Sequence, residues 1–126
     1  MDLFPTILAA TGTRNPAGHT VDGSNLQALL SGKPDPGHDA FLMHFPHDHN
    51  SSYFTSLRLG DWKLIYHYFE ENHYQLFNLK DDPYENTNLA EKNPDEVKRL
   101  LAEMQKRLTA EDALYPVKDG IEFKPE

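Results

Sequence analysis

The sequence contains no cysteine, which excludes disulfide bridges, thiolate nucleophiles and cysteine-ligated zinc. It is also poor in cations: 12 Lys and Arg against 20 Asp and Glu give a formal net charge of −8. Such a chain is not expected to bind nucleic acid phosphates or an anionic membrane surface, since both need clustered Lys and Arg. No apolar run approaches the ~20 residues that cross a bilayer. Met1 is followed by an acid rather than a basic stretch, so no signal peptide is predicted.

A chain of 126 residues with 38% hydrophobic residues can bury one core. We predict an α+β fold in which a small antiparallel sheet of about four strands is packed by a C-terminal helix, with short helices at the N-terminus. The expected parts are a helical lead-in over 2–32, the sheet over 39–80, the helix over 93–109 and an irregular tail over 110–126. All four belong to a single domain in this prediction.

Helix signals mark both ends of the chain. At the start, Asp2 is a candidate N-cap and Gly12 a stop for a helix over 2–11, and a second short helix is expected over 24–31. Met1 stands directly before the cap, as expected of a chain cut from a longer protein. Near the end, Asn93 and Glu96 fit a capping box. The apolar stripe that follows is typical of a helix lying on a sheet, and consists of Val97, Leu100, Leu101, Met104 and Leu108.

Strand signals occupy the middle of the chain. An apolar strand over 40–45 is expected to end at Pro46, because proline interrupts a hydrogen-bonded ladder. Gly60 and Asp61 predict a tight hairpin between the strands 53–59 and 62–69, and a further strand is expected over 74–79. In the strand after the hairpin, alternation places one set of side chains on a common face, namely Trp62, Leu64, Tyr66 and Tyr68.

Histidines gather at the end of the first predicted strand. His44, His47 and His49 stand with Asp48 within six residues, so zinc binding is one hypothesis. Strand alternation and Pro46 work against a common ligand geometry, which leaves a solvated loop cluster or ligand contact as the other interpretations. Histidines at a strand end can hydrogen-bond sugar hydroxyls or an anion. We predict no metal ligands in this chain, and His44 and His47 as the substrate-binding candidates.

The other candidate groups give weaker signals. Ser51 and Ser52 lie near the histidines, but no nucleophile-elbow glycine pattern surrounds them. Neighbouring acids in turns rarely form a catalytic pair, so they are interpreted as solvated. Aromatic residues at strand spacing could form a carbohydrate platform, although core packing explains them as well. We therefore predict no catalytic residue in this chain.

Four groups of residues, in order, resemble the C-terminal region of type I sulfatases, the formylglycine-dependent family of the alkaline-phosphatase-like superfamily. Each group is weak alone, and their order and spacing carry the resemblance over about residues 2 to 108. The groups are residues 2–8 with Gly12, 22–26 and 29–30; the stretch 44–47; the stretch 57–66; and residues 75–79 with 81–85 and 88–90.

The resemblance implies a subdomain that closes beside a large catalytic domain of the same polypeptide. It implies a sulfuric ester hydrolase acting on a sulfated small molecule or glycan, with calcium and formylglycine in the full-length enzyme. It also implies a periplasmic, secreted or lysosomal location. The family's Cys/Ser-x-Pro/Ala-x-Arg motif and its calcium ligands have no match here, so the chain alone is expected to be inactive.

Two other hypotheses stay open. A non-catalytic glycan-binding or interaction domain could use the same fold, and it would be stable and monodisperse. A histidine-based metallohydrolase would hold stoichiometric metal. The sulfatase interpretation instead expects an exposed apolar docking face, through which the isolated chain could form oligomers.

Overall fold

The computed structural model describes residues 1–34, 40–49 and 52–126. Residue 39, where the predicted sheet begins, therefore lies outside the described residues, as does Ser51. The chain divides into two compact units, Met1–Asp39 and Ala40–Glu126. No helix among the described residues is long and apolar enough to cross a membrane.

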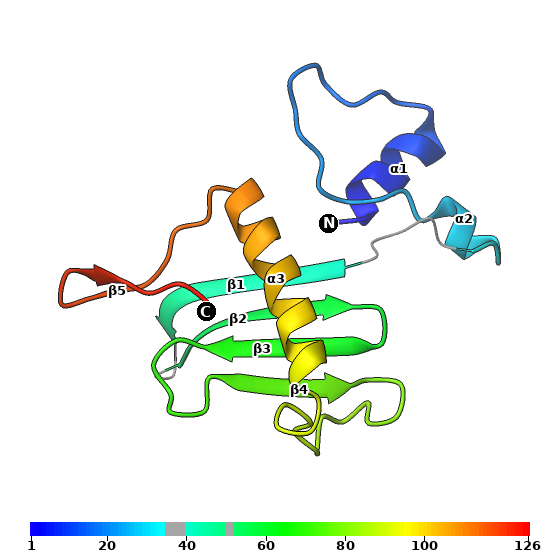
Figure 1. Cartoon of the computed structure of the whole chain (residues 1–126). Coiled ribbons are helices and arrows are strands. Elements are labelled where there is room, and N and C mark those ends of the chain that lie inside the picture. The colour runs from blue at the N-terminus through cyan, green and yellow to red at the C-terminus, as the bar shows by residue number, and fades with distance from the viewer. Residues whose placement is uncertain (35–39, 50–51) are drawn as a thin grey trace. The chain divides into compact units, whose positions relative to one another are not determined.

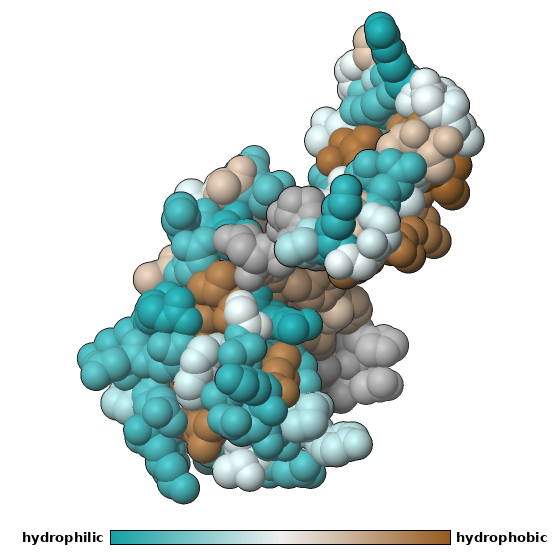
Figure 2. All heavy atoms as spheres, turned by 90° about the vertical axis from the view of Figure 1, so that its right-hand side faces the viewer, coloured by the Kyte–Doolittle hydropathy of each residue, from teal (hydrophilic) through white to brown (hydrophobic). Residues whose placement is uncertain are grey.

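The N-terminal unit contains helices α1 (Leu3–Thr11) and α2 (Gln27–Leu30). Asp2 occupies the predicted N-cap position of α1, but its carboxylate accepts the backbone N–H of Ser24 at 2.8 Å instead of one in its own helix. The hydroxyl of Thr6 likewise accepts the N–H of Leu26 at 2.9 Å. These two bonds join the helical segments. Hydrophobic side chains gather on the surface of this unit (Figure 2).

The second unit is built on a four-stranded antiparallel meander in the order β1-β2-β3-β4 (Figure 1). Its strands are β1 (Ala40–His49), β2 (Ser52–Leu59), β3 (Trp62–His67) and β4 (Tyr74–Asn78). Gly60 adopts a left-handed φ of 60° in the predicted hairpin, so that Leu59 pairs directly with Trp62. The predicted fold class is confirmed.

The prediction that the first strand ends at Pro46 is wrong. β1 continues to His49, with a shift of register between Phe45 and His49. Because β1 lies at the edge of the sheet, proline's missing N–H costs no ladder bond on its open side, and a bulge absorbs its fixed φ.

Helix α3 (Pro94–Ala110) lies on one face of the sheet (Figure 1). The predicted stripe packs as expected: Leu100 and Met104 are fully buried against residues such as Leu57 and Leu64. The predicted capping box is wrong. The Asn93 side chain donates to the Leu89 carbonyl, and Glu96 pairs with Arg99 on the next turn.

The tail differs from the predicted irregular segment, because it contains a short hairpin. Its strands are β5 (Val117–Lys118) and β6 (Ile121–Glu122). Asp119 and Gly120 make the turn with positive φ. The tail also carries Tyr115 and Phe123, whose side chains pack against the main core.

Candidate functional site

His44 lies on β1 opposite Thr55 of β2. Its Nδ1 is 2.7 Å from the Thr55 hydroxyl, and its Nε2 is 2.6 Å from the carbonyl oxygen of Leu114. A carbonyl can only accept, so Nε2 carries a proton, and in the neutral form of the ring Nδ1 then accepts from Thr55. The strand and the tail thus fix both the orientation and the tautomer of His44.

Thr55 continues this network into the core. Its hydroxyl is 2.8 Å from that of Tyr68, and Thr55 already donates to His44, so the tyrosine donates to the threonine. Burial raises the pKa of Tyr68 to about 12, partly offset by its hydrogen bond with Thr55. The His44 ring also meets the rings of Tyr68 and Tyr115 edge-on, at centroid distances of 6.3 and 5.7 Å. Every polar group of this buried chain therefore has a partner.

His47 has a different environment. Its ring is exposed and meets the ring of Phe45 edge-on at 5.8 Å. Phe45 in turn stacks on Phe54, on the sheet face away from α3. The two candidate histidines therefore contact opposite faces of the sheet. The side chains of Asp48 and His49 lie outside the part that the structure describes.

The described residues contain no group of three His, Asp or Glu side chains arranged to hold a metal ion. The sequence also lacks the motif from which sulfatases form formylglycine, since it contains no cysteine and no serine begins that motif. This chain therefore offers no residues of its own for formylglycine, and no cluster among its described residues for calcium.

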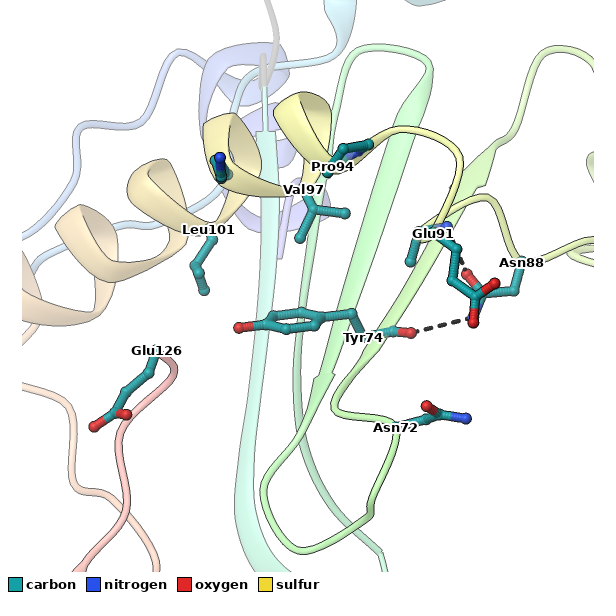
Figure 3. A pocket seen from close by; sticks show the side chains of 10 residues that line it. Asn72, Tyr74, Asn88, Glu91, Pro94, Val97, Leu101 and Glu126 are labelled. Carbon is teal, nitrogen blue, oxygen red and sulfur yellow. Dashed lines mark hydrogen bonds between the residues drawn. The ribbon is translucent and has the colours of Figure 1, made fainter.

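A cavity of about 460 Å³ lies between β4, the first turns of α3 and the end of the chain (Figure 3). Tyr74, Val97 and Leu101 form its apolar part, while Asn72 and Glu126 contribute polar groups. Burial, and then the charge of Glu126, raise the pKa of the Tyr74 phenol, so this ring is neutral at physiological pH. The described lining contains no Ser, Cys or His. The cavity can bind an amphipathic ring, and its described lining supplies no serine hydroxyl, thiol or imidazole nucleophile.

Sequence reasoning missed the partners of His44 and the cavity at Tyr74. Thr55 gave one usable signal, since it is a polar residue at an inward position of a strand and needs a buried partner. Leu114 gave none, because its contact with His44 spans 70 residues of chain. Asn88, in the last group of the resemblance, bonds to backbone: its Oδ1 accepts the N–H groups of Leu76 and Ala90.

The fold and the sequence together define a sulfatase C-terminal domain. A Bacteroides thetaiotaomicron protein assigned to the sulfatases has a similar structure, with a TM-score of 0.74 at 22% identity over 99% of this chain and 27% of that one. A second structure, solved in complex with its substrate D-glucosamine-2-N,6-O-disulfate, has a TM-score of 0.66 at 23% identity over 86% of this chain and 23% of that one.

The chain belongs to the family described as N-sulphoglucosamine sulphohydrolase, C-terminal, whose model matches residues 1–113. A curated relative, the N-acetylglucosamine-6-O-sulfatase of Bacteroides thetaiotaomicron, is 28% identical over 123 residues. That match covers 89% of this chain and 22% of the relative. The chain therefore spans about a fifth of the length of this relative.

Proposed function

We propose that this chain is the C-terminal region of a sulfatase that acts on a sulfated carbohydrate, and that it forms one wall of the substrate pocket. The family match over residues 1–113 carries this proposal. The glucosamine derivatives named for the relative and for a structural neighbour support a sulfated sugar as substrate. The catalytic domain of the same polypeptide is the proposed partner, and it supplies formylglycine and calcium.

The isolated chain is inactive in this proposal. Sulfate ester hydrolysis in the family needs a hydrated aldehyde nucleophile, and this chain has no precursor for it. Purified chain incubated with glucosamine 6-sulfate and calcium is expected to release no sulfate above the rate without protein. Sulfate release that follows the protein through purification, and disappears in a His44→Ala variant, would contradict this expectation.

His44 and His47 are the proposed contacts to the sugar or its sulfate. The network through Thr55 leaves Nε2–H of His44 as a donor, which suits an acceptor oxygen. The Leu114 carbonyl now accepts that proton, so a hydroxyl or sulfate oxygen would take the place of this carbonyl. His47 is exposed and can reach an anion without such an exchange.

The test uses a full-length sulfatase that carries this chain as its C-terminal region. His44→Ala and His47→Ala are each expected to lower kcat/KM at least severalfold, with most of the change in KM if the lost contact is equally strong in the ground state. His19→Ala, at an exposed histidine of the N-terminal unit, serves as control. Unchanged kinetics in both variants on the true substrate would remove the histidines from the site.

The cavity beside Tyr74 favours a second candidate, a glycan-binding domain without catalysis. An aromatic ring flanked by amide and carboxylate groups can stack on a sugar and bond its hydroxyls (Figure 3). This candidate expects a monodisperse chain that binds glycans and loses binding on Tyr74→Ala. A chain that binds no glycan under calorimetric titration would eliminate it.

A further inference from the structure

The cavity beside Tyr74 has one apolar wall, which β4 and α3 form together. Figure 3 shows the Tyr74 ring beneath Val97, with Leu101 further along the same helix. Tyr74 is only partly buried, and its raised pKa keeps the ring neutral. A neutral aromatic ring beside aliphatic side chains can stack on the apolar face of a sugar or lie beneath a cation. The volume of about 460 Å³ admits one such ring.

The same cavity offers polar groups that the fold leaves unused. Among the described residues, neither the Tyr74 hydroxyl nor the exposed Asn72 amide has a hydrogen-bond partner. Asn88 differs, because its Oδ1 accepts two backbone N–H groups and its amide donates to the Tyr74 carbonyl at 3.1 Å. Hydroxyl groups of a ligand would therefore bond to Tyr74 and Asn72 rather than to Asn88.

Negative charge predominates at the rim of the cavity. Two acids line it, Glu91 and Glu126, against a single lysine, Lys98. Both acids are exposed, and neither forms an ion pair with any part of the chain that the structure describes. The charge of Glu126 helps to raise the pKa of the Tyr74 phenol, so this carboxylate acts on the ring itself. A ligand with a positive charge is favoured here, and a sulfated ligand is disfavoured.

The start of α3 does not reverse this preference. A helix start often holds an anion through its free N–H groups and the helix dipole. Here Pro94 has no N–H to offer, and the N–H of Val97 is bonded to the Asn93 carbonyl at 3.1 Å. Asp95 in the first turn offsets part of the dipole. The helix therefore adds little attraction for a sulfate group.

We propose that this cavity binds an unsulfated ring that carries a protonated amine, such as a hexosamine with a free amino group. The ring stacks on Tyr74, its hydroxyls bond to Asn72 and to the Tyr74 phenol, and its ammonium group faces the acids of the rim. The inference rests on the second candidate function, glycan binding at this cavity. It goes further by naming the charge that the ligand carries and the sulfated sugars that the cavity disfavours.

The test titrates three sugars of different charge into the full chain, with binding followed by the NMR signals of the protein. Glucosamine carries a positive charge, N-acetylglucosamine is neutral, and N-acetylglucosamine 6-sulfate is negative. Glucosamine is expected to bind at least about fivefold more tightly than N-acetylglucosamine, and the sulfated sugar most weakly. The preference for glucosamine should decrease as salt is added, because the rim acids are exposed.

The double variant Glu91→Gln/Glu126→Gln removes both rim charges while nearly preserving side-chain size. It is expected to reduce the preference for glucosamine over N-acetylglucosamine to less than about twofold. Glu111→Gln/Glu122→Gln makes the same change at two exposed acids that do not line the cavity, and should keep the preference. Exposed positions were chosen in both pairs so that the core is not disturbed.

A second variant tests the aromatic ring. Tyr74→Leu keeps an apolar side chain at this position of β4 but removes the ring, and is expected to weaken glucosamine binding at least about fivefold. Tyr84→Leu is the matched control, at a tyrosine that is 85% exposed and outside the cavity, and should leave binding unchanged. Circular dichroism checks that every variant is folded.

Three results would overturn the inference: no binding of glucosamine, equal binding of the charged and neutral sugars, or tightest binding of the sulfated sugar. They bear differently on the second candidate function. If the two unsulfated sugars bind equally and both lose affinity in Tyr74→Leu, the cavity binds glycans and only the charge selection is wrong. If none of the sugars binds, the glycan-binding function fails as well. The sulfatase proposal is tested separately, by the kinetics of His44→Ala and His47→Ala.

Discussion

At the scale of single residues, the chain Tyr68–Thr55–His44 shows how a polar group can be buried without penalty. Each hydroxyl donates to the next member, and the series ends at the Leu114 carbonyl. Such hydrogen bonds stabilise the fold by only about 1 kcal/mol each, but a partner left unpaired costs roughly 1–3 kcal/mol. The network therefore matters more for the orientation of His44 than for total stability.

The raised pKa of Tyr68 predicts a loss of stability in alkali. An unfolded tyrosine ionises near 10.0, whereas the folded one holds its proton until about 12. The folded state thus binds more protons between these values, so the free energy of unfolding falls as pH rises through this window. The full difference corresponds to a loss on the order of 3 kcal/mol, and this loss is absent below pH 10.

Urea unfolding at a series of pH values measures this effect. In Tyr68→Phe, the free energy of unfolding is expected to fall less steeply above pH 10. Part of the fall should remain, because the pKa values of Tyr66 and Tyr74 are also raised in the folded state. Tyr84→Phe, at a side chain that is 85% exposed, should leave the curve unchanged. An equally steep decline in Tyr68→Phe would show that its ionisation is not coupled to folding.

At the scale of helices and strands, the sequence predicted the elements well and their ends less well. The meander and α3 follow from apolar periodicity and from the turn at Gly60, which are local signals. The predicted strand end at Pro46 was wrong because the effect of a proline depends on whether its strand lies at the edge of the sheet, which is a tertiary property. Asn93 misled for a similar reason, since its side chain bonds the Leu89 carbonyl rather than the helix it precedes.

The candidate site was less predictable than the fold. The sequence places His44 on a strand, but the faces that His44 and His47 contact depend on the shift of register after Phe45. The carbonyl of Leu114 reaches His44 only because the tail folds back after α3. Long-range packing of this kind has no periodic signature in the chain.

Core packing between α3 and the sheet gives a prediction for this scale. Leu100 is fully buried among sheet residues, so Leu100→Ala is expected to lower the free energy of unfolding by roughly 2–5 kcal/mol through lost burial and the cavity left behind. Leu114→Ala makes the same change at a side chain that is 82% exposed and should cost under about 0.5 kcal/mol. Thermal and urea unfolding measure both, and equal effects would contradict the assigned packing.

At the scale of the whole chain, several large apolar side chains remain exposed to solvent, which is energetically unfavourable. The N-terminal unit leaves Leu3, Ile7 and Leu30 59–76% exposed, and the sheet unit leaves Phe41 and Met43 open. The chain forms two compact units and matches about a fifth of the length of a relative. Exposed apolar side chains are expected in such a chain if it is one region of a larger protein, because the rest of that protein would cover them.

The isolated chain is therefore expected to bind a hydrophobic dye and to sediment as more than a monomer at micromolar concentration. Leu3→Gln/Ile7→Gln should reduce both signals, because it removes apolar surface from the exposed side of α1, whereas Ala9→Gln/Ala10→Gln on the same helix should not. Dye fluorescence and sedimentation velocity measure the two properties. A stable monomer without dye binding would instead favour the free-standing glycan-binding domain, because a domain that works alone has no docking surface to expose.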